Sequence, residues 1–320
     1  MTDIVYIGEK DTNRRVCRFC GRSISDGASF NNWSHAISEG LGNHNIFCLE
    51  ECDECNSKFG NTIENDIVAF FSPALAVYEI RGKKKGSKDG LRSLRSEAFD
   101  FKTGDGVKLV TVHDNQRIDE IIEGFKGNDK GGIELDAIHK WSKYVPANVY
   151  KSLCKFIISV VKPEYLCRFS KTIDWINGTI QDDEYTRYSV IQTELNTLIL
   201  SPFLAYHCPK DKRLPIYGIF AITNIGILFE IPYSGSSPQS QESRNQRDGV
   251  LRDICKQFFD TENASLLNLN SLNLTPAKSK FTISVDPSLI EGKDYFVAHG
   301  KKECEELIAK FSKSGIKPND

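Results

Sequence analysis

Two short cysteine motifs, Cys17-Arg-Phe-Cys20 and Cys52-Asp-Glu-Cys55, decide the fold of the N-terminal part of the chain. Each motif places two thiolates on one side of a tight turn, and together they offer the four ligands that zinc takes in a closed tetrahedral site. The 31 residues between them exceed the usual spacing, which predicts a folded insert. A redox role for either motif is the alternative, but the pairing of the two disfavours it. We therefore expect structural Zn²⁺ on these four cysteines.

The composition is that of a soluble globular protein. The chain has 320 residues, 40% hydrophobic and 26% charged, with a net charge of −2, which excludes disorder and a uniformly basic nucleic-acid binder. Of its ten cysteines, Cys48 is a spare candidate ligand that fits a strand residue better. The remaining five are predicted to be small buried side chains: Cys154, Cys167, Cys208, Cys255 and Cys304.

The localisation expected from the sequence is cytoplasmic. The N-terminus has no apolar core after a positive start, so it does not resemble a secretory signal. Cysteines of a reducing compartment are thiols or metal ligands rather than disulfides. The most apolar segment, Leu214 to Tyr233, is long enough to span a membrane, but its prolines and glycines and Glu230 favour a hairpin that turns near residues 224–226.

The predicted fold class is α+β, in three parts: a zinc-bound module over residues 1–75, a basic linker over 76–100 and a mixed α+β domain over 101–320. In the module, short strands and loops precede a helix that Pro73 ends. Farther on, apolar periodicity predicts further elements. They are helices over 146–163, 166–178 and about 301–313, a polar loop over 234–249 and a strand over 281–285.

The insert and its flanks carry a more specific pattern: Cys20-Gly21, then His35-Ala36-Ile37, then Leu41-Gly42-Asn43, then Cys55-Asn56. In order, spacing and residue type, residues 14–70 resemble the HNH endonucleases, the ββα-metal nucleases. The resemblance implies a β-hairpin followed by a helix, and hydrolysis of DNA phosphodiester bonds with the help of one divalent metal ion.

The resemblance also implies roles for single residues. His35 would be the general base, Asn43 would orient it through a loop contact, and Asn56 would bind catalytic Mg²⁺ or Mn²⁺. Many members have an acidic metal ligand directly before the histidine, whereas this chain has Ser34, a weak ligand. Glu39, Glu64 or His35 itself are then the other possible ligands. The residue types suit the chemistry, because imidazole accepts a proton near neutral pH and hard cations prefer oxygen.

Charge is unevenly distributed. Residues 1–70 contain six basic and eleven acidic side chains, a net charge of −5, so the module alone should bind DNA weakly. Residues 81–96 contain seven basic side chains and one acidic one, a charge of +6. This stretch is either a solvated linker or a segment that binds DNA phosphates. In the second case, the candidate DNA contacts are Lys83, Lys84, Lys85 and Lys88.

Two functions from different classes follow. The first is a metal-dependent DNA endonuclease, such as a bacterial restriction or anti-phage effector, whose C-terminal region binds a regulatory ligand or partner or forms a homo-oligomer. The second is a zinc-stabilised nucleic-acid-binding or protein-binding module without catalysis, which Ser34 favours.

Overall fold

The computed structural model describes residues 3–78, 80, 93–95, 99–104, 107–112, 132–180, 187–236, 241–259 and 264–284. The chain forms two compact units. Unit 1 contains Met1–Ala69, Ile80–Lys85 and Tyr144–Thr275, and unit 2 contains Phe70–Glu79, Gly86–Lys143 and Pro276–Asp320. The two units therefore combine segments from both sides of the predicted linker, and the three-part division of the chain stays a prediction.

The N-terminal part of unit 1 contains a small three-stranded sheet. Strand β3 (Ile46–Cys48) lies in its centre, parallel to β1 (Val5–Ile7) and antiparallel to β2 (Ser34–His35). Helix α1 (Asp53–Asn61) follows β3 closely. The hairpin β2–β3 followed by α1 is therefore a ββα arrangement.

A long antiparallel pair organises the rest of unit 1. Strand β8 (Val190–His207) pairs with β9 (Tyr217–Glu230), and the short β10 (Ala264–Leu266) pairs with the outer edge of β8. The register shifts between Glu194 and Phe203. Almost every side chain of β9 is buried, as expected for a strand that is covered on both faces.

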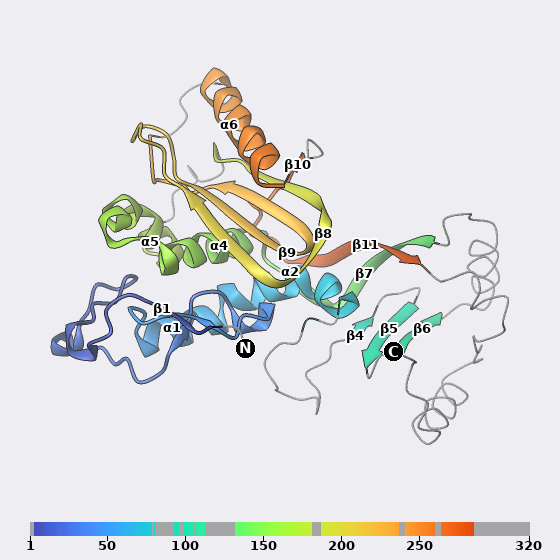
Figure 1. The fold of residues 1–320 in the computed structure, drawn as a ribbon, viewed down its shortest axis with the longest axis horizontal. Helices are drawn as coiled ribbons and strands as arrows, with labels where there is room; N and C mark the ends of the chain where they lie inside the picture. The colour runs from blue at the N-terminus through green and yellow to red at the C-terminus, as the bar shows by residue number, and fades with distance from the viewer. Residues whose placement is uncertain are drawn as a thin grey trace. The chain divides into compact units, whose positions relative to one another are not determined.

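Helices cover both faces of this sheet (Figure 1). On one face, Tyr217 and Ile219 form a core with Leu251 and Ile254 of α6 (Gln241–Phe259). On the other face, the ring of Phe220 lies 6.1 Å from that of Phe156 in α4 (Pro146–Val160). Alternation along β9 thus sends neighbouring side chains to different helices.

Helix α4 also contacts the N-terminal part. The Ser152 hydroxyl donates to the Ile63 carbonyl at 2.7 Å, at the start of α2 (Ile63–Val77). At the other end, the buried Arg18 guanidinium donates to the carbonyls of Ile158 (2.9 Å) and Val161 (2.7 Å). Carbonyls at a helix C-terminus have no partners within the helix, so a cation that binds them stabilises the end.

Two further sheets belong mostly to unit 2. Strands β4 (Ser93–Arg95), β5 (Phe99–Gly104) and β6 (Val107–Val112) form an antiparallel sheet in sequence order. Strand β7 (Gly132–Tyr144) pairs with β11 (Thr275–Ser284), which includes most of the predicted strand over 281–285.

The mixed α+β class is confirmed, and so is the helix that begins at Pro146. The helical pattern over 166–178 lies in the 3₁₀ helix η4 (Pro163–Phe169) and helix α5 (Ser170–Asn177), which Gly178 ends with a φ of 76°. A glycine in this left-handed conformation is the usual end of a helix. The predicted helix over 301–313 lies outside the described residues.

Three predictions of secondary structure are wrong. Pro73 lies inside α2 rather than at its end. A proline within a helix removes one backbone N–H donor, and burial of the neighbouring side chains Phe71, Ala74 and Leu75 offsets that cost. Residues 214–233 do not form a hairpin of their own, since β8 is the partner of β9. The predicted polar loop over 234–249 contains the start of α6, whose apolar side chains come later in the helix.

Candidate metal centre and active site

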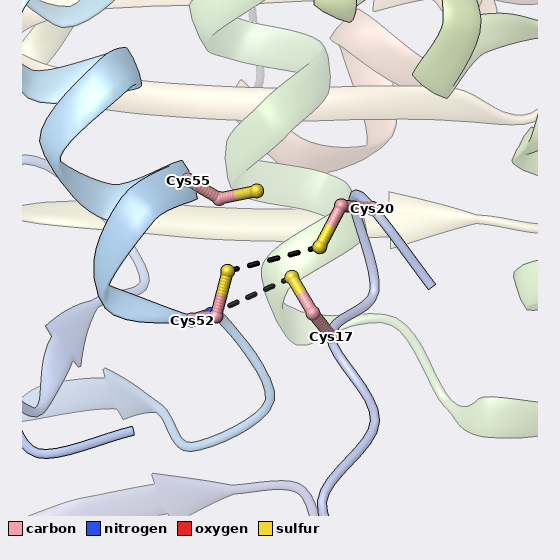
Figure 2. A group of neighbouring side chains, drawn as sticks. All are labelled: Cys17, Cys20, Cys52 and Cys55. Atoms are coloured by element: carbon pink, nitrogen blue, oxygen red, sulfur yellow. Dashed lines mark hydrogen bonds between the residues drawn. The ribbon is translucent and has the colours of Figure 1, made fainter. Parts of the chain in front are cut away.

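The four predicted zinc ligands come together. Cys17 and Cys20 lie on a tight turn, in which the Gly21 N–H donates to the Cys17 carbonyl at 2.9 Å. Gly21 has a φ of 71°, which a residue with a side chain rarely adopts. Cys52 is the N-cap of α1 and Cys55 lies in its first turn, so the helix start presents both sulfurs to the turn (Figure 2).

The geometry of the four sulfurs suits zinc. All four lie within 4.8 Å of one another, and Sγ of Cys20 is 3.7 Å from Sγ of Cys52. Tetrahedral zinc with bonds of about 2.3 Å places its sulfurs about 3.8 Å apart. The cluster is therefore a site that can bind zinc.

The other cysteines lie apart from this cluster. Cys48 is the last residue of β3 and is buried, and burial raises the pKa of its thiol to about 12. Cys154 and Cys255 are buried as predicted. The prediction is wrong for Cys167, which is exposed on the short η4 helix, and Cys208 is only partly buried. Cys304 lies outside the described residues.

His35 ends β2, opposite Phe47 of β3, and the two rings lie 4.6 Å apart. Its Nε2 lies 3.8 Å from Oε2 of Glu39, and the two side chains are 25% and 28% exposed. The pair is therefore accessible to solvent, as a general base and a metal-binding carboxylate must be.

Asn43 fixes the loop between β2 and β3. Its Nδ2 donates to the carbonyls of Ile37 (2.8 Å) and Ile46 (3.0 Å), and its Oδ1 accepts from the Ile46 N–H at 3.0 Å. Asn43 is buried, so these bonds are protected from water. The Asn43 side chain thus connects Ile37, two residues after His35, with Ile46 at the start of β3.

The remaining predicted ligands have different surroundings. Ser34 is fully buried, and its hydroxyl donates to the Glu51 carbonyl at 3.2 Å. Oε1 of Glu64 lies 2.9 Å from Nζ of Lys155. Asn56 lies half-buried on α1, directly after Cys55. Of the three, only Asn56 has a side chain for which the described contacts show no other partner, so it remains the better candidate ligand.

Lys155 was not expected from the sequence. It lies in α4, is fully buried, and its Nζ is 2.9 Å from Oε2 of Glu51 as well as from Glu64. It also donates to the His35 carbonyl at 3.3 Å. Burial alone would lower the pKa of Lys155, but the two carboxylates raise it, so the ammonium stays charged. The only sequence signal was a lysine within an apolar helical pattern.

A second buried polar cluster, formed by Tyr217, Glu230 and Arg247, was also missed. Within the described part of the chain, Tyr217 Oη, Glu230 Oε1 and Arg247 Nη1 have no hydrogen-bond partner. Oε2 of Glu230 accepts from the Ser189 N–H at 3.0 Å, and Arg247 donates to the Ser236 carbonyl. Burial raises the pKa of Glu230 to about 7.

No family model, curated protein or solved structure matches the chain. The four cysteines are the only group of three or more potential metal-binding side chains among the described residues. In that same part of the chain, no helix combines the length and apolarity needed to cross a membrane. The candidate DNA contacts Lys83, Lys84, Lys85 and Lys88 lie outside the described residues.

Proposed function

We propose that the protein is a metal-dependent endonuclease of the HNH type, with His35 as the general base. The observation that carries the proposal is the accessible His35–Glu39 pair at the end of a hairpin that leads into α1. The four-cysteine cluster supports it, because it joins the start of α1, the helix that carries Asn56, to the Cys17–Cys20 turn. At the same helix start, Asp53 accepts from the N–H groups of Asn31 and Asn32, just before the hairpin.

In this proposal, each residue of the site has its own role in phosphodiester hydrolysis. His35 takes a proton from water, and the carboxylate of Glu39 stabilises the imidazolium that results. Asn43 holds the loop that follows His35 in place. Mg²⁺ or Mn²⁺, held by Asn56 and Glu39 with oxygens of water and phosphate, would supply charge stabilisation at the phosphate.

A plasmid-nicking assay tests this function. Supercoiled DNA is incubated with the full chain and Mg²⁺ or Mn²⁺, and nicked circles are measured for wild type and His35→Ala. Removing a general base should slow nicking by roughly 10²–10⁴-fold. His44→Ala is the matched control, since this histidine is exposed on the loop between β2 and β3. Equal rates for wild type and His35→Ala with both ions would overturn the proposal.

The second candidate is a zinc-stabilised binding module without catalysis. The internal contacts of Ser34 and Glu64 favour it, because two of the candidate ligands of the catalytic metal then have other partners. Binding of plasmid without nicking under the same conditions is the outcome that this candidate predicts.

Phosphate binding is assigned in this proposal to the basic stretch over 81–96. Replacing Lys83, Lys84 and Lys85 with alanine should weaken DNA binding and lower its salt dependence. The reason is that a protein with fewer phosphate contacts releases fewer counterions from the DNA when it binds. An unchanged salt slope in a binding titration would refute this role. A restriction or anti-phage context rests on the resemblance alone.

A further inference from the structure

The strand that carries His35 lies at an edge of the N-terminal sheet. The strand order is β1-β3-β2, so β2 is an edge strand in the described part of the chain. The Ala36 N–H donates to the Ile46 carbonyl at 3.0 Å, which makes these two residues a hydrogen-bonded pair of the hairpin. In an antiparallel hairpin, such pairs alternate with residues whose backbone groups point away from the partner strand. His35, opposite Phe47, is one of these, so its carbonyl faces the open edge.

An ammonium group from a distant part of the chain binds this edge. Nζ of Lys155 in α4 donates to the His35 carbonyl at 3.3 Å, and the two residues are 120 positions apart in the sequence. The same Nζ lies 2.9 Å from Oε2 of Glu51 and 2.9 Å from Oε1 of Glu64. A lysine ammonium has three N–H groups, and three oxygens surround this one. The Lys155 side chain is fully buried, so water does not compete for these donors.

Glu51 contacts both this ammonium and the other residue of β2. Its carboxylate lies beside Lys155, while its backbone carbonyl accepts from the Ser34 hydroxyl at 3.2 Å. Ser34 is fully buried and directly precedes His35. Both residues of β2 are therefore bound from outside the hairpin, one through its hydroxyl and the other through its backbone carbonyl. A strand of only two residues has few backbone hydrogen bonds of its own, so these contacts bear directly on where the His35 backbone lies.

We propose that Lys155 is a positioning residue of the nuclease site, which fixes the backbone of His35 and so directs its imidazole toward the attacking water. This inference rests on the proposed function and deepens it. A general base must lie within hydrogen-bond reach of the proton that it takes. A displacement of about 1 Å can slow an enzyme roughly 100-fold. Because Lys155 is buried, it acts through the His35 backbone and not on the substrate.

The site then includes a helix from outside residues 1–75, the predicted nuclease module. Helix α4 begins at Pro146 and also contacts the central sheet of unit 1, where the Tyr150 hydroxyl donates to the Glu230 carbonyl at 2.6 Å. The central sheet thus supports α4, and α4 supports β2 through Lys155. Residues 1–75 alone lack this contact and are an incomplete catalytic unit.

Plasmid-nicking kinetics of the full chain test this role. The triple variant Lys155→Met, Glu51→Gln, Glu64→Gln removes the ammonium without leaving two buried carboxylates unpaired. Its kcat should fall roughly 10–100-fold with KM unchanged, while zinc content and a urea curve show that it is folded. Ser152→Ala is the matched control, because it removes another contact of α4 with the N-terminal part, the donation to the Ile63 carbonyl, and should keep the wild-type kcat. A wild-type kcat in the folded triple variant would overturn the proposal.

Amide hydrogen exchange, measured by NMR, gives a readout that does not depend on cleavage. The Ala36 amide should exchange roughly tenfold faster in the triple variant, because a hydrogen bond from a charged donor no longer fixes β2. The Leu49 amide donates to the Ile7 carbonyl at 2.8 Å, on the β1 side of the sheet, and its exchange should stay unchanged. Equal acceleration of both amides would overturn the proposal, since Lys155 would then stabilise the whole sheet and not position β2.

A second variant covers the case in which the triple variant does not fold. Lys155→Met with Glu51→Gln alone then replaces it, because the Glu64 side chain is 11% exposed and can keep its charge in contact with water. The two measurements also separate this role from the enzyme. If the wild type cuts no DNA, the nuclease function fails, and exchange of the Ala36 amide still decides whether Lys155 fixes β2. If His35→Ala is inactive while the triple variant keeps the wild-type kcat, the nuclease function stands and the positioning role fails.

Discussion

Glu51 and Glu230 are both only 1% exposed, and burial raises the pKa of each to about 7. Their surroundings differ. Glu51 shares the ammonium of Lys155 with Glu64, so a charge partner from α4 lies within 2.9 Å. Glu230 accepts from one backbone N–H at 3.0 Å, and its other oxygen, like Oε1 of Glu51, has no hydrogen-bond partner among the described residues.

The two surroundings follow from what holds each region together. Around Glu230, β9 lies between two helices and an apolar core provides the stability. The N-terminal part is joined to α4 by polar contacts of Lys155, Arg18 and Ser152. A region with a large core can tolerate one poorly paired acid, whereas a region held by polar contacts depends on each of them.

The strongest test of this comparison removes the metal site. Cys52→Ala should release zinc and unfold the N-terminal part, since structural zinc sites in small modules contribute roughly 10 kcal/mol or more to folding. Metal analysis and limited proteolysis measure the effect. Cys167→Ala, an exposed cysteine, is the control and should keep its zinc. Wild-type protein purified without zinc would refute the metal site.

Next in size is Lys155→Met, which leaves Glu51 and Glu64 without their ammonium. Breaking a buried ion pair from one side costs about 3–5 kcal/mol, which a urea unfolding curve would show. Lys162→Met, on the exposed end of the same segment, should cost little. Adding Glu51→Gln and Glu64→Gln should recover most of the loss. If Lys155→Met alone is as stable as wild type, the cluster does not join the two parts.

A pH series on Glu230→Gln tests the poorly paired acid. The folded state holds a proton on Glu230 up to a pKa of about 7, while the unfolded state releases it at its ordinary pKa near 4.5. Wild-type stability should therefore fall as pH rises through this window, by up to roughly 3 kcal/mol. Glu230→Gln should lack the share of this loss that comes from Glu230, while the share from Glu51, whose pKa is also raised to about 7, should remain. Exposed Glu164→Gln should keep the wild-type profile, and identical profiles for Glu230→Gln and wild type would contradict the prediction.

The smallest expected effect is the difference in stability between removing the hydroxyl of Tyr150 and removing that of Tyr217. The Tyr150 hydroxyl donates to the Glu230 carbonyl at 2.6 Å, so Tyr150→Phe should cost about 1 kcal/mol or more. Tyr217→Phe removes a hydroxyl without a partner among the described residues, so it should be neutral or slightly stabilising. Thermal unfolding of the two variants gives the comparison, and a larger loss for Tyr217→Phe would show that its hydroxyl has a partner such as bound water.

Local patterns predicted much of the candidate site. Cys17 and Cys20 are brought together by one tight turn, and Cys52 and Cys55 are brought together by the first turn of one helix. The apolar spacing after Pro146 predicted α4 for the same reason, since a helix is made of near neighbours. The predicted hairpin over 214–233 failed because a strand partner is chosen from the whole chain, and β8 is that partner.

The sequence by itself determined the four-cysteine cluster and the helix that presents two of its sulfurs, because neighbouring residues build both. Only the tertiary structure decided that Lys155 donates to the His35 carbonyl, that Ser34 and Glu64 have internal partners, and that Tyr6 and Phe47 are in register with His35. These contacts join residues that are far apart in the chain, and their energies depend on burial and charge pairing, which arise only when the elements pack together.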